Sequence, residues 1–183
     1  MVVTSQPARI MTQGPGATVS VGRALAALVC VGDVVLLVGD LGAGKTQLTK
    51  GLAVGLGVEE PVTSPTFNIL LLHAGRVPLY HFDLYRLLDA AQLEDIDYWG
   101  TLEADGVSVV EWGDRFPEAI PDECLTIRIA ITADEERELS AETRGARPSE
   151  LWGQLVAAAA TLPGVVVIDA VTSGHAGDEA VDR

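Results

Sequence analysis

The apolar positions in the first third of the chain follow two different periods. In residues 19–29 they recur at helical spacing with alanines between them, which predicts a helix. Residues 34–38 are all apolar, a run typical of a strand buried on both faces of a parallel sheet. Residues 45–56 return to helical spacing, with leucines along one face. We expect Gly51 and Gly55 in this second helix to allow close packing on the sheet.

The middle third of the chain has the pattern of a hairpin followed by a helix and a strand. Residues 67–72 and 77–82 are apolar runs joined by His73-Ala74-Gly75-Arg76, which predicts a β-hairpin. Asp89 can cap a helix over residues 90–98. Residues 107–111 form another run of the buried-strand type, and this run ends in a carboxylate.

The last third predicts two paired strands, a helix and a tail. Residues 125–131 alternate isoleucine with threonine and arginine, which indicates a half-exposed strand, and residues 138–143 are its expected partner across an acidic turn. Ser149 can cap a last helix that ends at Ala160. We expect one domain over residues 1–163, in which 1–15 are a loose N-terminal arm or an edge strand. Residues 164–183, an apolar run and then polar residues, are expected to be a mobile tail.

The charge of the chain excludes one class of function. Its 183 residues are enough for one domain with a real core, and 12 Lys and Arg against 26 Asp and Glu give a formal charge of −14. Non-specific binding to nucleic acid requires a basic surface, so we expect no DNA partner and no direct coating of RNA. If the protein works near RNA, another protein supplies the RNA contacts.

The cysteines and the apolar runs bear on where the protein works. Cys30 and Cys124 lie on apolar stretches far apart in sequence, and we expect two buried, reduced thiols. No apolar run is long enough to span a membrane, and the N-terminus lacks the basic start and apolar core of a signal peptide. We therefore expect a cytoplasmic protein with no membrane partner.

One motif organises the rest of the chain. Gly39-Asp40-Leu41-Gly42-Ala43-Gly44-Lys45-Thr46 matches the P-loop pattern G-x-x-x-x-G-K-[ST]. Its glycines let backbone N–H groups surround a phosphate, and the helix that follows points its positive end at the same group. Lys45 would reach the β- and γ-phosphates, and the Thr46 hydroxyl would bind Mg²⁺. The alternative, a glycine-rich turn with an exposed lysine, does not explain the buried strand before the motif and the helix after it.

The predicted elements and this motif define the expected fold. It is an α/β fold, a single P-loop NTPase-like domain with a mixed sheet. The sheet has a parallel core and a β-hairpin, and helices cover both of its faces.

A P-loop of this kind needs a second Mg²⁺ anchor, an acid at the carboxyl end of a nearby strand. Asp83, Glu111 and Asp169 each follow an apolar run. Asp169 lies near the chain end, where a strand or tail cap is the better interpretation. Asp83 and Glu111 can share the site, one binding the metal and the other polarising a water. Asp83 could instead cap a turn or pair with Arg86, and Glu111 could be a strand-end charge paired with an arginine.

Two further residues could close the site. Pro65 favours an extended conformation at Ser64, which would present Thr66 to Mg²⁺ and the γ-phosphate as a switch threonine. The alternative is a loop threonine that bonds its own backbone. Trp112 could pack near the nucleotide, or it could simply cap the end of the sheet. Because the guanine-reading tetrapeptide N-K-x-D is absent from the sequence, we expect ATP rather than GTP.

The order GDLGAGKT, SPTF, HFDLYRL and VEW resembles the TsaE (YjeE) family, bacterial ATPases of tRNA threonylcarbamoyladenosine synthesis. The resemblance covers about residues 19–145. It implies a compact P-loop protein that binds ATP and Mg²⁺ and works with TsaB and TsaD, with weak hydrolysis in their absence. Those partners transfer a threonylcarbamoyl group to the adenosine beside the tRNA anticodon, so contact with tRNA would be indirect.

The P-loop motif and the family resemblance imply roles for individual residues. The expected nucleotide-binding residues are Asp40, Leu41, Gly42, Ala43, Gly44, Lys45, Thr46 and Trp112. The expected Mg²⁺ ligands are Thr46, Thr66, Asp83 and Glu111. The expected catalytic residues are Lys45, Thr66 and Glu111, with Glu111 either a general base or a support for the metal.

Two other functions remain open from the residues alone. A small-molecule kinase would add a mobile lid with several arginines, and the only comparable cluster is Arg137, Arg144 and Arg147, set among glutamates. A nucleotide-gated binding module without useful hydrolysis would use the same P-loop.

Overall fold

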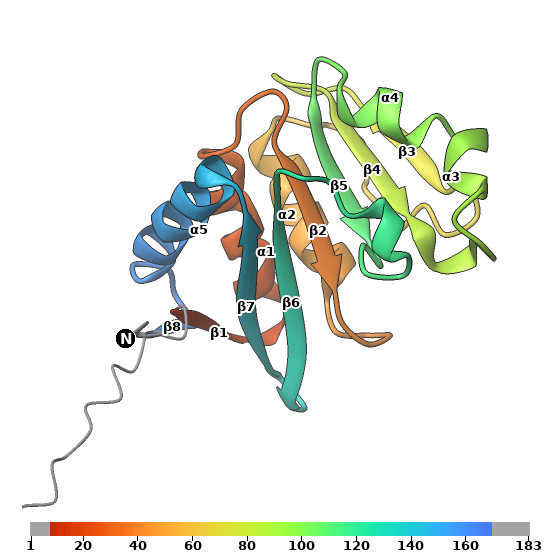
Figure 1. Ribbon diagram of the computed structural model, residues 1–183. Helices are drawn as coiled ribbons and strands as arrows, with labels where there is room; N and C mark the ends of the chain where they lie inside the picture. Colours follow the sequence, from red (N-terminus) through yellow and green to blue (C-terminus); the bar gives the residue numbers. More distant parts are fainter. Residues whose placement is uncertain (1–7, 170–183) are drawn as a thin grey trace, which may run out of the picture.

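The computed structural model describes residues 8–169, and these residues form an eight-stranded mixed sheet flanked by helices (Figure 1). The strand order is β3-β4-β5-β2-β6-β7-β1-β8. The strands are β1 (Arg9–Gln13), β2 (Val34–Val38), β3 (Leu70–His73), β4 (Leu79–Asp83), β5 (Val107–Glu111), β6 (Cys124–Ala133), β7 (Glu136–Arg144) and β8 (Val165–Ile168). The helices are α1 (Gly14–Ala26), α2 (Lys45–Gly55), α3 (Gln92–Asp95), α4 (Tyr98–Leu102) and α5 (Ala146–Ala159), with short 3₁₀ turns η1 (Leu84–Arg86) and η2 (Pro117–Ala119).

The middle of the sheet is parallel and its edges are antiparallel. Strands β4, β5, β2 and β6 run in the same direction, so their carboxyl ends meet at one edge of the sheet. The hairpin partner β3 is antiparallel to β4, and β7, β1 and β8 continue the sheet beyond β6 in antiparallel pairs. The expected α/β fold with a parallel core and a β-hairpin is confirmed.

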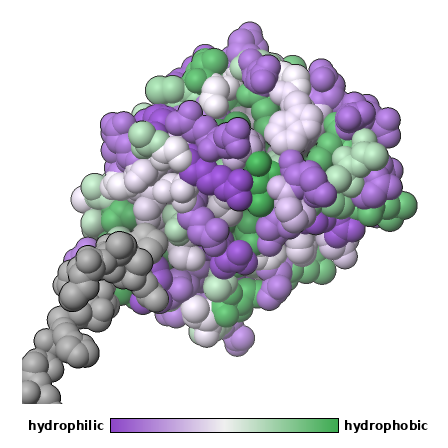
Figure 2. Space-filling view, viewed as in Figure 1, coloured by the Kyte–Doolittle hydropathy of each residue, from purple (hydrophilic) through white to green (hydrophobic). Residues whose placement is uncertain are grey.

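Two hydrophobic cores lie on opposite faces of the sheet. The larger core packs α1, α2 and α5 against one face of the strands. The smaller core packs α3, α4 and η2 against β4, β5 and β2 on the other face. Strands β6 and β7 therefore have one open face, and Figure 2 shows mostly hydrophilic residues on the side of the molecule that carries them in Figure 1.

The α2 glycines pack against a helix and not against the sheet. A Cβ on Gly51 would lie 2.0 Å from the Val19 carbonyl oxygen, and a Cβ on Gly22 would lie 2.1 Å from the Leu48 carbonyl oxygen. Both glycines are needed because the backbones of α1 and α2 touch. The expectation that Gly51 and Gly55 allow packing on the sheet is thus wrong about the partner. This contact fixes α2, and with it the turn that precedes α2.

Both ends of the domain differ from the prediction. Residues 9–13 are β1 and not a loose arm; the alternative of a strand is correct, but β1 lies between β7 and β8 and not at the edge of the sheet. Helix α1 begins at Gly14, five residues before the predicted start. Residues 165–168, assigned to the tail, form β8 and pair with β1. The predicted mobile segment beyond residue 169 lies outside the described residues. Each of these short strands pairs with a segment from the other end of the domain, so the local sequence of neither one indicates the pairing.

The middle of the chain also holds differences. The single helix predicted over residues 90–98 is two short helices, because Asp97 takes a left-handed conformation with φ 48° between them. Asp89 Oδ1 accepts a hydrogen bond from the backbone N of Gln92, as a capping residue would, but the N-cap position of α3 is Ala91. Strand β3 begins at Leu70, since residues 66–68 form a turn and residue 69 a bend. Helix α5 begins at Ala146, so Ser149 lies inside its first turn and is not its cap.

The two thiols differ in exposure. Cys124 is buried as expected, but Cys30 is exposed in the turn after α1. The helix ends at Ala26, four residues earlier, so Cys30 never enters the core. In the described part of the chain, none of the helices has the length and apolarity that a membrane span requires.

Candidate nucleotide-binding site

The P-loop joins β2 to α2 at the carboxyl edge of the parallel strands. Gly42 and Gly44 adopt φ 81° and 109°, values that residues with a Cβ rarely take. Gly44 is the N-cap of α2, so the unpaired N–H groups of the first helical turn face outward from the loop. This arrangement offers a positive helix end to an anion.

Lys45 is folded back over the loop. Its Nζ donates to the carbonyl oxygens of Gly39 and Asp40, at 2.6 and 2.9 Å, and the side chain is buried. Burial lowers the pKa of Lys45, and the negative charges of Glu111 and Asp83 oppose that shift. The Lys45 ammonium is desolvated and hydrogen-bonds only to neutral carbonyls. It is therefore suited to bind a strong anion.

Asp83 ends β4 and collects the hydroxyls of the 64–66 loop. Its Oδ2 lies 2.6 Å from Ser64 Oγ and 2.7 Å from Thr66 Oγ1, and both hydroxyls can donate to it. Its Oδ1 accepts from the backbone N of Tyr85 at 3.0 Å. Asp83 therefore does cap a turn, as one of the alternatives held, and it also anchors the predicted switch loop.

Glu111 ends β5 directly beside Asp83, since the two residues are register partners in the parallel pair β4–β5. Thr46 Oγ1 donates to Glu111 Oε2 at 2.9 Å. The other oxygen, Oε1, lies 2.9 Å from His81 Nε2. Among residues 8–169 no arginine pairs with Glu111, whose basic partner is His81. Because β5 is the neighbour of β2 and β4 is one strand further, Glu111 and not Asp83 contacts the P-loop threonine.

Trp112 forms a wall of the site. Its backbone is left-handed, with φ 60°, which is uncommon for a residue with a large side chain. The indole ring lies over Lys45, with Nζ 3.8 Å from a ring centroid, and packs against Tyr85 at 4.9 Å between ring centroids. The strained backbone turns this aromatic ring toward the P-loop lysine.

These side chains line one pocket of about 320 Å³. Its walls carry the P-loop, the 64–66 loop and the ends of β4 and β5. The lining residues are Leu41, Gly42, Gly44, Lys45, Thr46, Gln47, Ser64, Thr66, Asp83, Tyr85, Glu111 and Trp112. A smaller pocket of about 170 Å³ adjoins the P-loop on the side of α1 and shares Gly42, Gly44 and Gln47 with the first. Arg137 on β7 lines it and donates from Nε to the Ala43 carbonyl at 3.1 Å.

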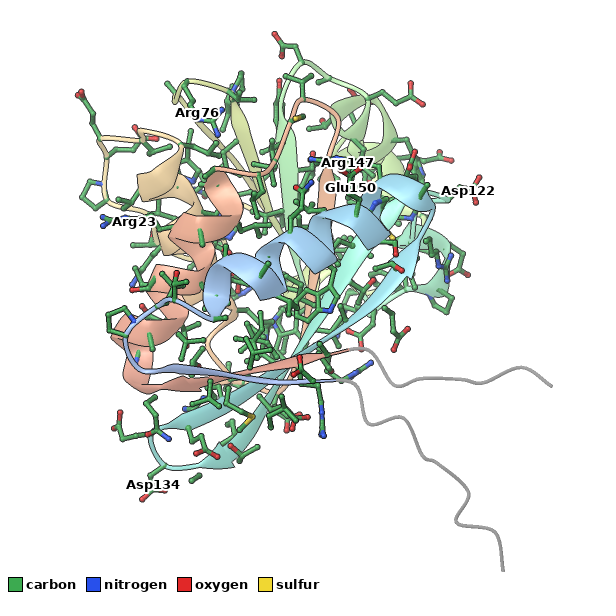
Figure 3. The ribbon with its side chains drawn as sticks, turned by 90° about the vertical axis from the view of Figure 1, so that its left-hand side faces the viewer. Arg23, Arg76, Asp122, Asp134, Arg147 and Glu150 are labelled. Carbon is green, nitrogen blue, oxygen red and sulfur yellow. The ribbon has the colours of Figure 1, made fainter. Side chains whose placement is uncertain are left out.

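Other candidates lie away from the pocket. Asp169 follows β8, the outermost strand of the sheet and four places from β2, so it lies far to the side of the pocket. Arg144 pairs with Cys124 at the amino end of β6. Arg147 binds Asp33 and lies on α5, away from Asp134 at the tip of the β6–β7 hairpin (Figure 3). The three arginines considered as a kinase lid are therefore dispersed, and only Arg137 is beside the P-loop.

Four residues without a predicted role lie at or beside the site. Ser64 and Tyr85 line the pocket, His81 contacts Glu111, and Gln47 lies between the two pockets. Ser64 and Tyr85 could have been found, since both stand within the motifs SPTF and HFDLYRL. Strand alternation also puts His81 on the same face as Asp83.

The donor set fits a nucleotide with a magnesium ion. Thr46, Thr66, Asp83 and Glu111 present oxygen atoms within one pocket, and oxygen atoms are the ligands that Mg²⁺ prefers. Mg²⁺ is commonly held by one or two carboxylates together with phosphate oxygens and water. Backbone N–H groups and a buried lysine face the same space, as triphosphate binding requires.

Comparisons with known proteins agree with this geometry. A family model described as "Threonylcarbamoyl adenosine biosynthesis protein TsaE" matches residues 12–139. A protein named "tRNA threonylcarbamoyladenosine biosynthesis protein TsaE" from Bacillus subtilis is 41% identical over 145 residues, 79% of this chain and 90% of its own. The protein of the same name from Streptomyces coelicolor is 46% identical over 134 residues, 69% of this chain and 90% of its own.

A solved structure is also similar. The crystal structure of Bacillus subtilis YdiB aligns with a TM-score of 0.69 at 36% sequence identity, covering 82% of this chain and 94% of YdiB. The fold, the site and the matched residues lead to the same conclusion. The chain belongs to the TsaE family.

Proposed function

We propose that this protein is a Mg²⁺-dependent ATPase required for threonylcarbamoyladenosine modification of tRNA, and that it acts with TsaB and TsaD. The names of its relatives support the pathway, since they are tRNA threonylcarbamoyladenosine biosynthesis proteins. The partners follow from the family resemblance in the P-loop, SPTF, HFDLYRL and VEW motifs.

One observation carries the ATPase proposal. Two strand-end carboxylates, a P-loop threonine and a buried lysine converge on a single pocket at the carboxyl edge of a parallel sheet. Ligands bind to open α/β sheets at this edge. An ordinary glycine-rich turn would not account for this convergence of a lysine, an aromatic ring, a hydroxyl and two carboxylates.

In this proposal the P-loop residues bind the phosphates. Backbone N–H groups of residues 40–46 surround the β-phosphate, and Lys45 exchanges its two carbonyl partners for phosphate oxygens. Trp112 moves with Lys45 or packs beside the bound nucleotide. The smaller pocket on the α1 side of the loop, with Arg137, is the space into which the nucleoside would extend.

The oxygen ligands prepare hydrolysis. Thr46, Glu111, Asp83 and Thr66 would hold Mg²⁺, which supplies positive charge to the phosphate oxygens when it is bound. Glu111 Oε2 now accepts from Thr46, and its exchange to a water would orient that water for attack on the γ-phosphate. Thr66 is poised on Asp83 and would turn toward the γ-phosphate.

The acidic charge of −14 fits a component that does not itself bind the tRNA. TsaB and TsaD would supply the contacts to RNA. We therefore expect the ATPase step to matter for the reaction of the partners, and not for recognition of the nucleic acid.

An ATPase assay with and without TsaB and TsaD, combined with reconstituted tRNA modification, tests the proposal. We expect Mg²⁺-dependent phosphate release that rises with the partners, and a tRNA product that requires this protein. A phosphorylated small molecule without a dependent tRNA product would support a kinase. A tRNA product that requires ATP binding and not hydrolysis would support a nucleotide-gated module.

A further inference from the structure

His81 lies beneath the proposed catalytic carboxylate. It is on β4, two residues before Asp83, and its side chain is 0% exposed. Its Nε2 is 2.9 Å from Glu111 Oε1. It does not line the nucleotide pocket, so it cannot touch ATP, and any effect it has on the reaction must pass through Glu111.

The hydrogen-bonding capacity of His81 fixes its tautomer. An ionised carboxylate can only accept hydrogen bonds, so Nε2 carries the proton and donates to Glu111. The other ring nitrogen, Nδ1, is buried and has no partner within residues 8–169. The bond to Glu111 is therefore the one polar contact that explains a histidine at this position in the core.

The two oxygens of Glu111 are divided between two partners. Oε1 accepts from His81 in the protein interior, and Oε2 faces Thr46 and the pocket. A carboxylate tied through one oxygen keeps its other oxygen in a fixed direction. Without that tie, Glu111 could rotate and accept both donors or neither.

We infer that His81 is a positioning residue for Glu111: its Nε2–H anchors Oε1 and so directs Oε2 at Thr46 and the reacting water. This inference rests on the proposed ATPase function. It assigns His81 no contact with ATP and no proton transfer, only the orientation of the carboxylate.

A second buried histidine provides a matched control. His73 is on β3, 4% exposed, and its ring centroid is 5.9 Å from that of His81. Its Nδ1 contacts Glu60 Oε1 at 2.8 Å, on an exposed side chain, and it makes no contact with Glu111. Substitution of His73 disturbs the same core as substitution of His81 and leaves the carboxylate anchored.

The experiment compares His81→Gln with His81→Asn, using His73→Asn as the control and thermal unfolding to confirm folding. A glutamine amide can place an N–H where Nε2 stands, but an asparagine amide is too short. We expect His81→Asn to lower kcat for ATP hydrolysis by ~10- to 100-fold, the usual effect of losing a partner that orients a ligand. KM should be little changed, His81→Gln should recover most of the rate, and His73→Asn should match wild type.

A double-mutant cycle gives the sharper readout. In a Glu111→Gln background, His81→Asn should cost little further rate, because the carboxylate that it positions is already gone. Equal rates for His81→Gln and His81→Asn, a full additional loss in the Glu111→Gln background, or a change confined to KM would each overturn the inference.

The imidazole nitrogen spectrum tests the bond independently of activity. We expect ¹⁵N NMR of wild type to show His81 as the Nε2–H tautomer, and an Nδ1–H tautomer would overturn the inference. Wild type that fails to hydrolyse ATP with its partners would instead overturn the proposed function, while the spectrum would still decide whether His81 donates to Glu111.

Discussion

The two ends of the parallel strands carry charged residues that are arranged in opposite ways. At the amino end, Asp33 and Arg147 form a two-point ion pair, with Nη2–Oδ2 and Nε–Oδ1 distances of 2.7 and 3.1 Å. Two of the paired atoms also bond to the backbone: Asp33 Oδ2 accepts from Cys30 N, and Arg147 Nη2 donates to the Leu28 carbonyl. At the carboxyl end, Lys45 Nζ donates to two backbone carbonyls and lies against the Trp112 ring. The nearby carboxylates Glu111 and Asp83 accept hydrogen bonds from the Thr46 and Thr66 hydroxyls.

The difference separates stability from function. The Asp33–Arg147 pair ties α5 to the turn before β2, and hydrogen bonding to Asp33 raises the pKa of Arg147. Burial instead lowers the pKa of Lys45, and the charges of Glu111 and Asp83 oppose that shift without cancelling it. Charges that neutralise one another hold a fold together, whereas charges left facing a pocket are available to a ligand.

The largest effect should follow substitution of the pocket lysine. Lys45→Ala should reduce ATP turnover by ~10²- to 10³-fold, the cost of removing one preorganised group that stabilises developing charge. Binding of ATP should weaken as well, and the circular dichroism spectrum should stay that of wild type. Lys50→Ala, on the same helix α2, is the control and should leave ATP binding and turnover intact. Normal hydrolysis by a folded Lys45→Ala variant would show that the pocket is not the ATP site.

The two strand-end aspartates should differ strongly. Asp83→Asn removes a charge from the pocket, and we expect it to lower Mg²⁺-dependent turnover by ~10- to 100-fold, the scale seen when metal-site partners are lost. Asp169→Asn, just after the outermost strand β8 and four places from β2, should have little effect. A Mg²⁺ titration of phosphate release with both variants measures the ranking. If Asp169→Asn lowered turnover more than Asp83→Asn, the assignment of the metal site to the end of β4 would be wrong.

The amino-end pair should affect stability and not turnover. Arg147→Met leaves Asp33 without its charged partner and should lower the free energy of unfolding by about 1.5–3 kcal/mol. Urea denaturation gives this value, and ATP hydrolysis measured well below the unfolding temperature should match wild type. Loss of activity in a folded Arg147→Met variant would contradict the assignment of the Asp33–Arg147 pair to stability alone.

The smallest effect concerns the thiols. Cys30 is exposed, while Cys124 is buried and burial raises the pKa of its thiol, so an alkylating reagent should modify Cys30 alone in the folded protein. Mass spectrometry of labelled peptides reads the result, and unfolded protein should be labelled at both. ATP turnover should not change on labelling, since Cys30 is at the amino end of the strands. Rapid native labelling of Cys124 would contradict its burial.

The sequence predicted what is contiguous in it. The P-loop lies in one stretch with its strand and helix, and β2 has the predicted bounds. The β6–β7 pair was also predicted, because alternation and an acidic turn are local signals. The places of β1 and β8 were not predicted: an edge strand was only one alternative for the first residues, and residues 165–168 were assigned to the tail. These segments from the two ends of the domain pair only with each other and with β7.

The site was predicted as a set of residues and not as a set of contacts. Strand order decides that Glu111 meets Thr46 and that Asp83 meets Thr66, and no local pattern encodes the order β4-β5-β2. The left-handed backbone of Trp112 and the bond from His81 to Glu111 likewise depend on tertiary packing.

The central claim is that Glu111 turns a nucleotide pocket into an ATPase, and Glu111→Gln tests it most directly. One preparation of the variant should be measured for ATP affinity, phosphate release and tRNA product with TsaB and TsaD. We predict that ATP binding persists and that phosphate release falls by at least ~10²-fold, the lower end for loss of a general base, with the tRNA product falling in parallel. Unchanged phosphate release from the folded variant would contradict the catalytic role of Glu111.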